Sequence, residues 1–235
     1  MNLRNATALV TGGSSGIGLA IAKALVDAGS RVAITGRNQD RLAEAAKAIG
    51  AHPIKADVSS EDDVTRTYRE LFDKFGHLDI LVNNAAFGER RSLVDMDRAK
   101  FDAILQTNVI GMMLMSREAA KHFVERKAGN IINIGSTAGV HGAANGTSYY
   151  ASKFAVRGMT ECWRAELRQH NVRVFLVNPR EVLTNFAATA GFSQDDKNPT
   201  KLQSEDIAHM VKAVLEMNDR GFTTELTVFA TNPKD

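Results

Sequence analysis

Short apolar runs alternate with longer segments of helical periodicity along almost the whole chain. The runs with strand character lie at 7–11, 31–35, 80–83, 130–134, 172–177 and 226–229, with a weaker one at 52–55. Several of them, such as ILVN at 80–83, are apolar at consecutive positions, which is typical of strands covered by helices on both faces. Strands connected by helices run parallel with right-handed crossovers, so the pattern predicts an α/β protein with a doubly wound parallel sheet of about seven strands.

The composition suits one cytoplasmic domain. With 235 residues, of which 44% are hydrophobic, the chain is long enough to bury one core, and we expect a single domain over residues 1–235. The absence of a leader-like segment and of any run of roughly 18 apolar residues predicts no membrane partner. Lys and Arg number 29 against 27 Asp and Glu without a basic run, so no nucleic-acid partner is expected. The single cysteine, Cys162, suits a reducing compartment and is expected to be buried and inert.

A glycine-rich turn, TGGSSGIG at 11–18, joins the first strand to an amphipathic helix. Gly12 permits the tight turn, Gly16 lets the backbone approach a pyrophosphate, and Gly18 lets helix and strand pack closely. The free N–H groups at the helix start favour a bound phosphate. Further contacts are expected from Ser14, Ser15 and Ile17. The GxxxGxG spacing without a following Lys-Ser/Thr argues against a triphosphate P-loop and predicts a dinucleotide site, the alternative being an ordinary glycine-rich loop.

The end of the second strand indicates which dinucleotide is preferred. An NAD site places an acidic residue there to hold the ribose 2′-hydroxyl, but this chain has Gly36, Arg37 and Asn38 after the strand. The planar fork of Arg37 can pair with a 2′-phosphate, which favours NADP(H). The alternative is a solvated arginine at the start of a helix.

Tyr149 and Lys153 are four residues apart in a helical segment, so their side chains lie on one face. A carbonyl that receives a hydride needs a proton, and tyrosine, with a pKa near 10, gives one readily only if a nearby cation stabilises the phenolate. Lys153 can supply that cation. Ser136 follows a strand and can donate a hydrogen bond to the developing oxyanion, while Asn108 can anchor a water that relays protons to Lys153.

These motifs together resemble the classical short-chain dehydrogenase/reductase family, and the resemblance covers nearly all of the chain. TGGSSGIG matches the family's TGxxxGxG, Asp57 with Val58 matches the adenine-binding pair, and 83–85 matches most of NNAG. The family's catalytic tetrad is filled in order by Asn108, Ser136, Tyr149 and Lys153. The resemblance implies a Rossmann fold with a cofactor half at about 1–130 and a catalytic and substrate half at about 131–235, which includes a flap at about 185–203.

The resemblance also implies roles for residues around the cofactor. Asp57 and Val58 contact adenine, Asn84 and Ala85 lie against the adenosine ribose, and Lys153 with Tyr149 lies at the nicotinamide ribose. Thr184 closes over the carboxamide, with Pro179 and Val182 in the same motif. The resemblance further implies a homodimer or homotetramer, because the family builds its dimer interface from the two long helices, here at 98–127 and 148–169.

The predicted function is NADPH-dependent reduction of a ketone, aldehyde or 3-oxoacyl thioester to an alcohol, or the reverse, with Tyr149 as acid/base. The alternative is a regulatory protein that binds NADP(H) without turnover. The histidines lack metal-ligand spacing, so no metal is expected. Two features stay open: Arg180, where the family has glycine, is expected either to contact an anion or to point to solvent, and the charged loop at 87–91 either borders the substrate or is merely solvated.

Overall fold

The computed structural model describes residues 1–184, 186, 190 and 198–233. Among these, seven strands form one parallel sheet with the order β3-β2-β1-β4-β5-β6-β7. Their bounds are β1 Thr7–Val10, β2 Arg31–Gly36, β3 His52–Lys55, β4 Ile80–Asn83, β5 Gly129–Ile134, β6 Val172–Pro179 and β7 Glu225–Val228. The doubly wound parallel sheet predicted from the sequence is confirmed, including the weak strand β3.

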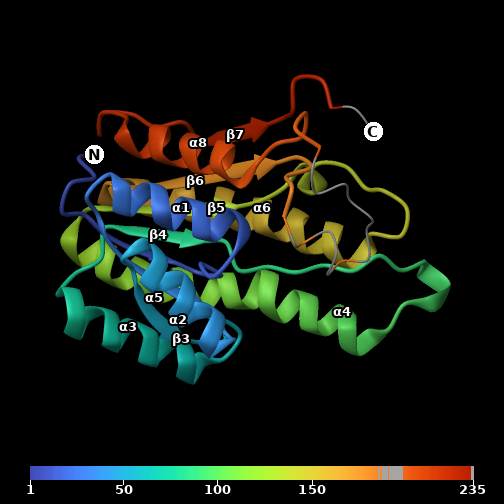
Figure 1. Cartoon of the computed structure of the whole chain (residues 1–235), viewed down its shortest axis with the longest axis horizontal. Helices are drawn as coiled ribbons and strands as arrows, with labels where there is room; N and C mark the ends of the chain where they lie inside the picture. The colour runs from blue at the N-terminus through green and yellow to red at the C-terminus, as the bar shows by residue number, and fades with distance from the viewer. Residues whose placement is uncertain (185, 187–189, 191–197, 234–235) are drawn as a thin grey trace.

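Helices cover both faces of this sheet (Figure 1). One face carries α1 Gly16–Asp27, α2 Gln39–Ile49 and α8 Ser204–Glu216, and the other carries α3 Glu61–Phe75, α5 Met112–Arg126 and α6 Thr147–Leu167. Neighbouring strand residues face opposite cores: Ala8 and Val10 of β1 join the first core, and Leu9 joins the second. Burial on both faces explains why the strands are apolar without alternation.

The strand order reverses between β1 and β4, which are neighbours in the sheet. The chain winds from β1 towards β3 on one side and from β4 towards β7 on the other. In such sheets the crevice outside the carboxyl ends of the two strands at the reversal is the usual ligand site. The glycine turn after β1 and the residues after β4 are therefore placed together by topology.

The helical segment predicted at 98–127 is interrupted by a wider turn. It consists of α4 Arg98–Leu105, a π-helical turn η2 Gln106–Gly111, and α5. Gly111 permits a close approach at this turn, because a Cβ there would lie 2.7 Å from Cγ2 of Val58. Single π turns recur at functional sites, and this one contains Asn108. Three short 3-10 helices complete the described elements: η1 Leu93–Asp95, η3 Thr137–Gly139 and η4 Arg168–His170.

One sequence expectation is wrong and another lies mostly outside the described residues. Cys162 is exposed on α6 rather than buried, because it falls on the face of that helix turned away from the sheet. Most of the expected flap at 185–203 belongs to residues that the structure does not describe; of its described part, Leu202 forms a bridge with Val182.

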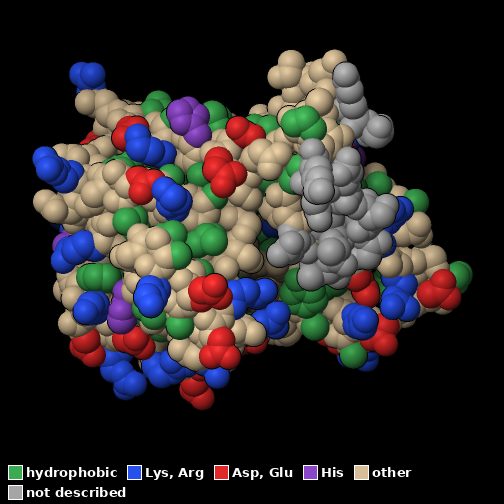
Figure 2. Space-filling model, viewed as in Figure 1, with side chains coloured by type: hydrophobic (Ala, Val, Ile, Leu, Met, Phe, Trp, Pro, Cys, Tyr) green, Lys and Arg blue, Asp and Glu red, His purple; other side chains and the backbone are tan. Residues whose placement is uncertain are grey.

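The visible surface carries mixed charge. In Figure 2, Lys and Arg side chains are interspersed with Asp and Glu over the face that is shown. Within the described ranges, no helix combines the length and the apolar character needed to cross a bilayer.

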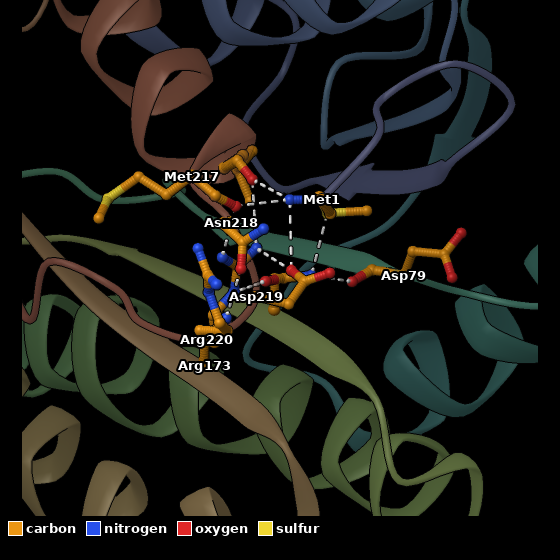
Figure 3. Close-up of polar contacts among 9 residues, drawn as sticks. Met1, Asp79, Arg173, Met217, Asn218, Asp219 and Arg220 are labelled. Carbon is orange, nitrogen blue, oxygen red and sulfur yellow. Dashed lines mark hydrogen bonds and ion pairs between the residues drawn. The ribbon is translucent and has the colours of Figure 1, made fainter.

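A polar cluster at the amino-terminal edge of the sheet donates hydrogen bonds to backbone carbonyls at the end of α8 (Figure 3). The Arg173 guanidinium, on β6, donates to Oδ1 of Asn130 at 2.8 Å and to the carbonyls of Leu215 and Met217 at 3.2 and 3.3 Å. The α-ammonium of Met1 donates to the same two carbonyls, each at 2.8 Å. Carbonyls at a helix end lack partners within the helix, so this cluster satisfies them.

We expect Arg173→Met to lower the free energy of unfolding by about 2–3 kcal/mol, because buried Oδ1 of Asn130 loses its charged donor and the end of α8 keeps only the Met1 ammonium. The ion pair with Asp219 adds little to this figure, since the Asp219 side chain is 75% exposed. Urea denaturation measures the change. Arg220→Met, on an exposed neighbouring arginine, is the matched control and should change stability by less than about 0.5 kcal/mol. Equal effects of the two substitutions would contradict the role of the cluster.

Candidate active site

The glycine turn has a backbone that side chains would obstruct. Gly12 and Gly16 have φ angles of +63° and +53°, a region that favours glycine. A Cβ on Gly18 would lie 2.4 Å from the carbonyl oxygen of Gly12. Ser15, the N-cap of α1, makes no side-chain capping hydrogen bond to the described part of the chain. The first-turn N–H groups of α1 therefore remain available for an anion.

Residues after β4 hold this turn in place. The Asn84 side-chain amide donates to the carbonyls of Thr11 and Gly12 at 3.0 and 3.2 Å. The Thr11 hydroxyl accepts from the backbone N–H groups of Asn84 and Ala85 at 2.9 and 3.1 Å. Asn84 and Ala85 are thus in the crevice, and the structure gives Asn84 a positioning role that the sequence did not suggest. Its contact with a ribose stays a prediction.

The residues expected around the adenosine lie along the carboxyl ends of β2 and β3. Oδ1 of Asp57 accepts from the backbone N–H and the hydroxyl of Ser59 at 3.0 and 2.7 Å. Val58 is buried against the π turn. A Cβ on Gly36 would lie 3.3 Å from the Ser14 hydroxyl, so the glycine turn meets the residues just before Arg37. The Arg37 side chain is exposed at this point.

Tyr149, Lys153 and Ser136 meet at the carboxyl edge of the sheet. Nζ of Lys153 lies 5.6 Å from the centre of the Tyr149 ring and donates to the carbonyl of Ile134 at 2.8 Å. Ser136 follows β5, and its backbone N–H donates to Oδ1 of Asn178 at 3.2 Å. The Ser136 hydroxyl accepts from the N–H of Ala138 at 3.1 Å. The helix and the strand end therefore bring all three side chains to one place.

Burial shifts the pKa values of both titratable groups. Burial raises the pKa of Tyr149 to about 12, while a hydrogen bond with Ser136 acts in the opposite direction. Burial also lowers the pKa of Lys153 to about 8. The phenol is consequently protonated at neutral pH, and the ammonium is charged at neutral pH but titrates just above it.

Asn108 connects the π turn to two other parts of the site. Its amide nitrogen donates to the carbonyl of Phe87 at 2.8 Å and to the hydroxyl of Ser152 at 3.0 Å, and its oxygen accepts from the N–H of Phe87 at 3.0 Å. Ser152 in turn donates to the carbonyl of Tyr149 at 2.7 Å. Both amide hydrogens of Asn108 are thus used within the protein, while its oxygen keeps a second lone pair that a water could use. The water relay at Asn108 stays a prediction.

The Tyr149 ring is held between two residues that sequence reasoning missed. A Cβ on Gly88 would lie 2.9 Å from Cδ2 of Tyr149, and the Phe186 ring centre is 5.2 Å from that of Tyr149. Thr184 lies over the glycine turn, with its Cγ2 3.4 Å from a Cβ built on Gly16. Thr184 and Phe186, which follow β6, therefore lie across the crevice. Pro179 is the last residue of β6, and Val182 forms the bridge with Leu202.

A family model described as short chain dehydrogenase matches residues 6–195. This chain belongs to the short-chain dehydrogenase family. An uncharacterized oxidoreductase of Staphylococcus saprophyticus is 32% identical over 234 residues, which cover 97% of this chain and 98% of the relative. The crystal structure of a metagenomic short-chain oxidoreductase in complex with NADP has a TM-score of 0.86 and 32% identity, covering 99% of this chain and 100% of that one.

A 3-ketoacyl-(acyl-carrier-protein) reductase from Brucella melitensis, solved with NADH, has a TM-score of 0.90 and 30% identity, covering 97% of this chain and 98% of that one. The family and the reaction class expected from the sequence, oxidoreduction, are confirmed by these comparisons. This short-chain dehydrogenase carries the family's tetrad residues at one edge of its sheet, as described above.

Arg180 stands where the family pattern has glycine, and its side chain lies at the surface. Its Nε donates to Glu181 at 3.2 Å, and its guanidinium lies 5.6 Å from the centre of the Phe229 ring. The side chain is exposed. Both expectations for Arg180, contact with an anion and a position in solvent, therefore stay predictions, because an exposed guanidinium is compatible with either.

Three polar residues of the site went unpredicted for different reasons. Thr11 belongs to the glycine motif, so the sequence predicted its place in the turn but not its hydrogen bonds with Asn84 and Ala85. Asn178 precedes Pro179 in the sequence, and it reaches Ser136 only because β5 and β6 are neighbours. Ser152 carried no signal, because a serine one residue before Lys153 is indistinguishable from an ordinary helical serine.

Proposed function

We propose that this short-chain dehydrogenase uses NADPH to reduce a ketone, an aldehyde or a 3-oxoacyl thioester to the alcohol, or catalyses the reverse reaction. The observation that carries the proposal is the convergence of the Tyr149 phenol, the Lys153 ammonium and the Ser136 hydroxyl beside the glycine turn. No other described cluster offers a proton donor, a cation and a hydroxyl next to a crevice of this kind.

The residues of the crevice fit a dinucleotide. Gly12 and Gly18 let the turn pack directly against Ala85 and Asn84, with which a Cβ would clash. The first turn of α1 offers N–H groups to a pyrophosphate, and Thr184 lies over the turn. NADPH, when bound, supplies the hydride. The cofactor contacts proposed for Ser14, Ile17, Asp57 and Val58 follow from their places along the same edge.

The chain's own residues handle the proton. Tyr149 donates its phenolic proton to the carbonyl oxygen, and Ser136 donates a hydrogen bond to the same oxygen as negative charge develops. Lys153 stabilises the resulting phenolate, because its ammonium is held near the ring and away from bulk water. In the oxidative direction the same phenolate accepts the proton of the alcohol.

The preference for NADPH rests on Arg37, because similar structures have been solved with either dinucleotide. Arg37 is exposed at the end of β2, next to Asn38, whose side chain caps α2 by accepting from the N–H of Arg41. An exposed guanidinium at this strand end supports pairing with a 2′-phosphate.

Arg37→Asp should lower the ratio of kcat/KM for NADPH to kcat/KM for NADH by about 10- to 100-fold, because a charged hydrogen bond is lost and a like charge replaces it. Initial rates with both cofactors give the ratio. Arg69→Asp, which makes the same charge change at an exposed position on α3, should leave the ratio unchanged. An unaltered ratio in the Arg37 variant would remove the basis for NADPH preference.

Oxidation of NADPH in the presence of simple ketones, aldehydes and a 3-oxoacyl thioester tests the proposed function directly. Turnover that depends on the carbonyl compound supports it. Tight NADPH binding without turnover across the whole panel would instead support a regulatory protein that binds the cofactor.

We also propose that residues 1–235 form one cytoplasmic domain that assembles as a homodimer or homotetramer through α4, α5 and α6. Phe154 and Ile110, on α6 and the π turn, are 46% and 37% exposed, which supports a buried position in an assembly. Light scattering measures the mass, and a monomer would contradict this assembly.

A further inference from the structure

A wide-mouthed surface pocket of about 500 Å³ lies beside the candidate active site, at the junction of two loops. Its lining is polar and comes from the segment after β4 and from the loop before α6: Arg90, Arg91, Ser92, Asp95 and Asn145. Two arginines and an asparagine bring hydrogen-bond donors to this lining, and Asp95 brings a carboxylate.

The pocket is connected to the catalytic tyrosine through both of its loops. The backbone N–H of Arg91 donates to the carbonyl of Asn145 at 2.8 Å, and Asn145 precedes Tyr149 by one turn's length of chain. Gly88, three residues before Arg91, packs directly against the Tyr149 ring. The pocket and the catalytic tyrosine are thus joined by short stretches of the same two loops.

Arg91 is anchored beside the pocket by an ion pair with Glu89, whose carboxylate lies 3.5 Å from Nε of Arg91. That Nε is buried and makes no hydrogen bond within the described residues. The Arg91 side chain as a whole is 39% exposed, so its outer part is what a ligand in the pocket can reach. Asp95, the acid that lines the pocket, accepts a hydrogen bond from the hydroxyl of Ser92 at 2.5 Å.

We propose that this pocket binds an anionic group of the substrate, a carboxylate or a phosphate, and that Arg91 selects for it. A guanidinium binds either oxyanion through two parallel hydrogen bonds, and the side-chain amide of Asn145 can add a donor on the same wall. This inference rests on the proposed function, because it assigns a substrate class to the same site. Arg91 is a specificity residue here, since it acts on the substrate at a distance from the reacting carbonyl.

Two matched substrate pairs test the inference. The carboxylate arm compares 4-oxopentanoate with 4-oxopentanamide, and the phosphate arm compares dihydroxyacetone phosphate with dihydroxyacetone. We expect the charged member of at least one pair to have a kcat/KM about 10-fold or more above its neutral partner. In Arg91→Met that advantage should disappear, mainly through a higher KM for the charged compound.

Arg98→Met is the matched control. Arg98 begins α4, a few residues after Arg91, but its side chain is 94% exposed and does not line the pocket. It should keep the preference for the charged compound. Equal kcat/KM values within both pairs, or the same loss in both variants, would overturn the inference while the proposed function stands.

A second measurement covers the case in which none of the four compounds turns over. Calorimetric titration of the NADP⁺-bound protein then compares the four compounds in the wild type and in Arg91→Met. Binding of a charged compound that is about 10-fold tighter than its partner, and lost in the variant, supports the inference even though the proposed reaction fails for that compound. Equal binding within both pairs refutes it.

Discussion

The Tyr149→Phe variant is expected to bind NADPH as tightly as the wild type and to lose roughly 10²–10⁴-fold in kcat. The substitution removes the proton donor but keeps the ring, so the contacts with Phe186 and Gly88 remain. Single-turnover rates measure the chemical step, and the fluorescence of bound NADPH measures binding.

Tyr150→Phe provides a matched control for this loss. Its ring centre lies 6.3 Å from that of Tyr149, and the substitution removes the same atom from an adjacent residue. Turnover should be close to that of the wild type. If the Tyr149 variant kept more than a tenth of the wild-type kcat, or if the two variants lost activity equally, Tyr149 would not be the proton donor.

The Lys153→Met variant is expected to lose activity on a similar scale, because the phenolate that forms at Tyr149 loses its nearby cation. In the wild type, kcat/KM for reduction should fall as the pH rises through about 8, where Lys153 gives up its proton. Lys121→Met, on a lysine of α5 with a side chain that is 65% exposed, should change neither the rate nor the pH profile. A wild-type profile that stays flat up to pH 10 would contradict this role.

The same lysine makes stability depend on pH with a definite sign. Its pKa in the folded protein, about 8, is below its ordinary value of 10.5, so between these values the unfolded chain binds more protons. The free energy of unfolding therefore rises with pH from about 8 towards 10.5 and carries the full burial penalty below pH 8. Urea denaturation at pH 7 and 9.5 should show this rise in the wild type and a smaller one in Lys153→Met.

The sheet was predictable because strands that are buried on both faces have consecutive apolar residues in the sequence. Strands such as β4 and β6 are apolar at successive positions, and even β3, which is short and partly exposed, has weak strand character in the sequence at 52–55. The division of the segment at 98–127 was not predictable, because the apolar pattern continues through it. The π turn depends instead on the close approach of Gly111 to Val58, a contact between distant parts of the chain.

The site was predictable where residue type determines chemistry. A tyrosine and a lysine one turn apart, and glycines after a strand, can be interpreted without coordinates. Contacts made by ordinary residues were not: Asn178 meets Ser136 across neighbouring strands, and Gly88 meets Tyr149 from a loop. The surface position of Arg180 depends on Glu181 and Phe229, and only the folded chain brings Phe229 to it.

The π turn of residues 106–111 also constrains how this enzyme can change in length. Each residue added to or removed from a regular helix rotates everything beyond it by about 100°. The wider turn absorbs one extra residue, so deleting one residue here would restore a regular helix and leave Leu114 and Phe123 of α5 facing the sheet. The same deletion within α4 or α5 would instead rotate the buried side of the helix away from the core, and the loss of the wider turn would displace Asn108 from Phe87 and Ser152.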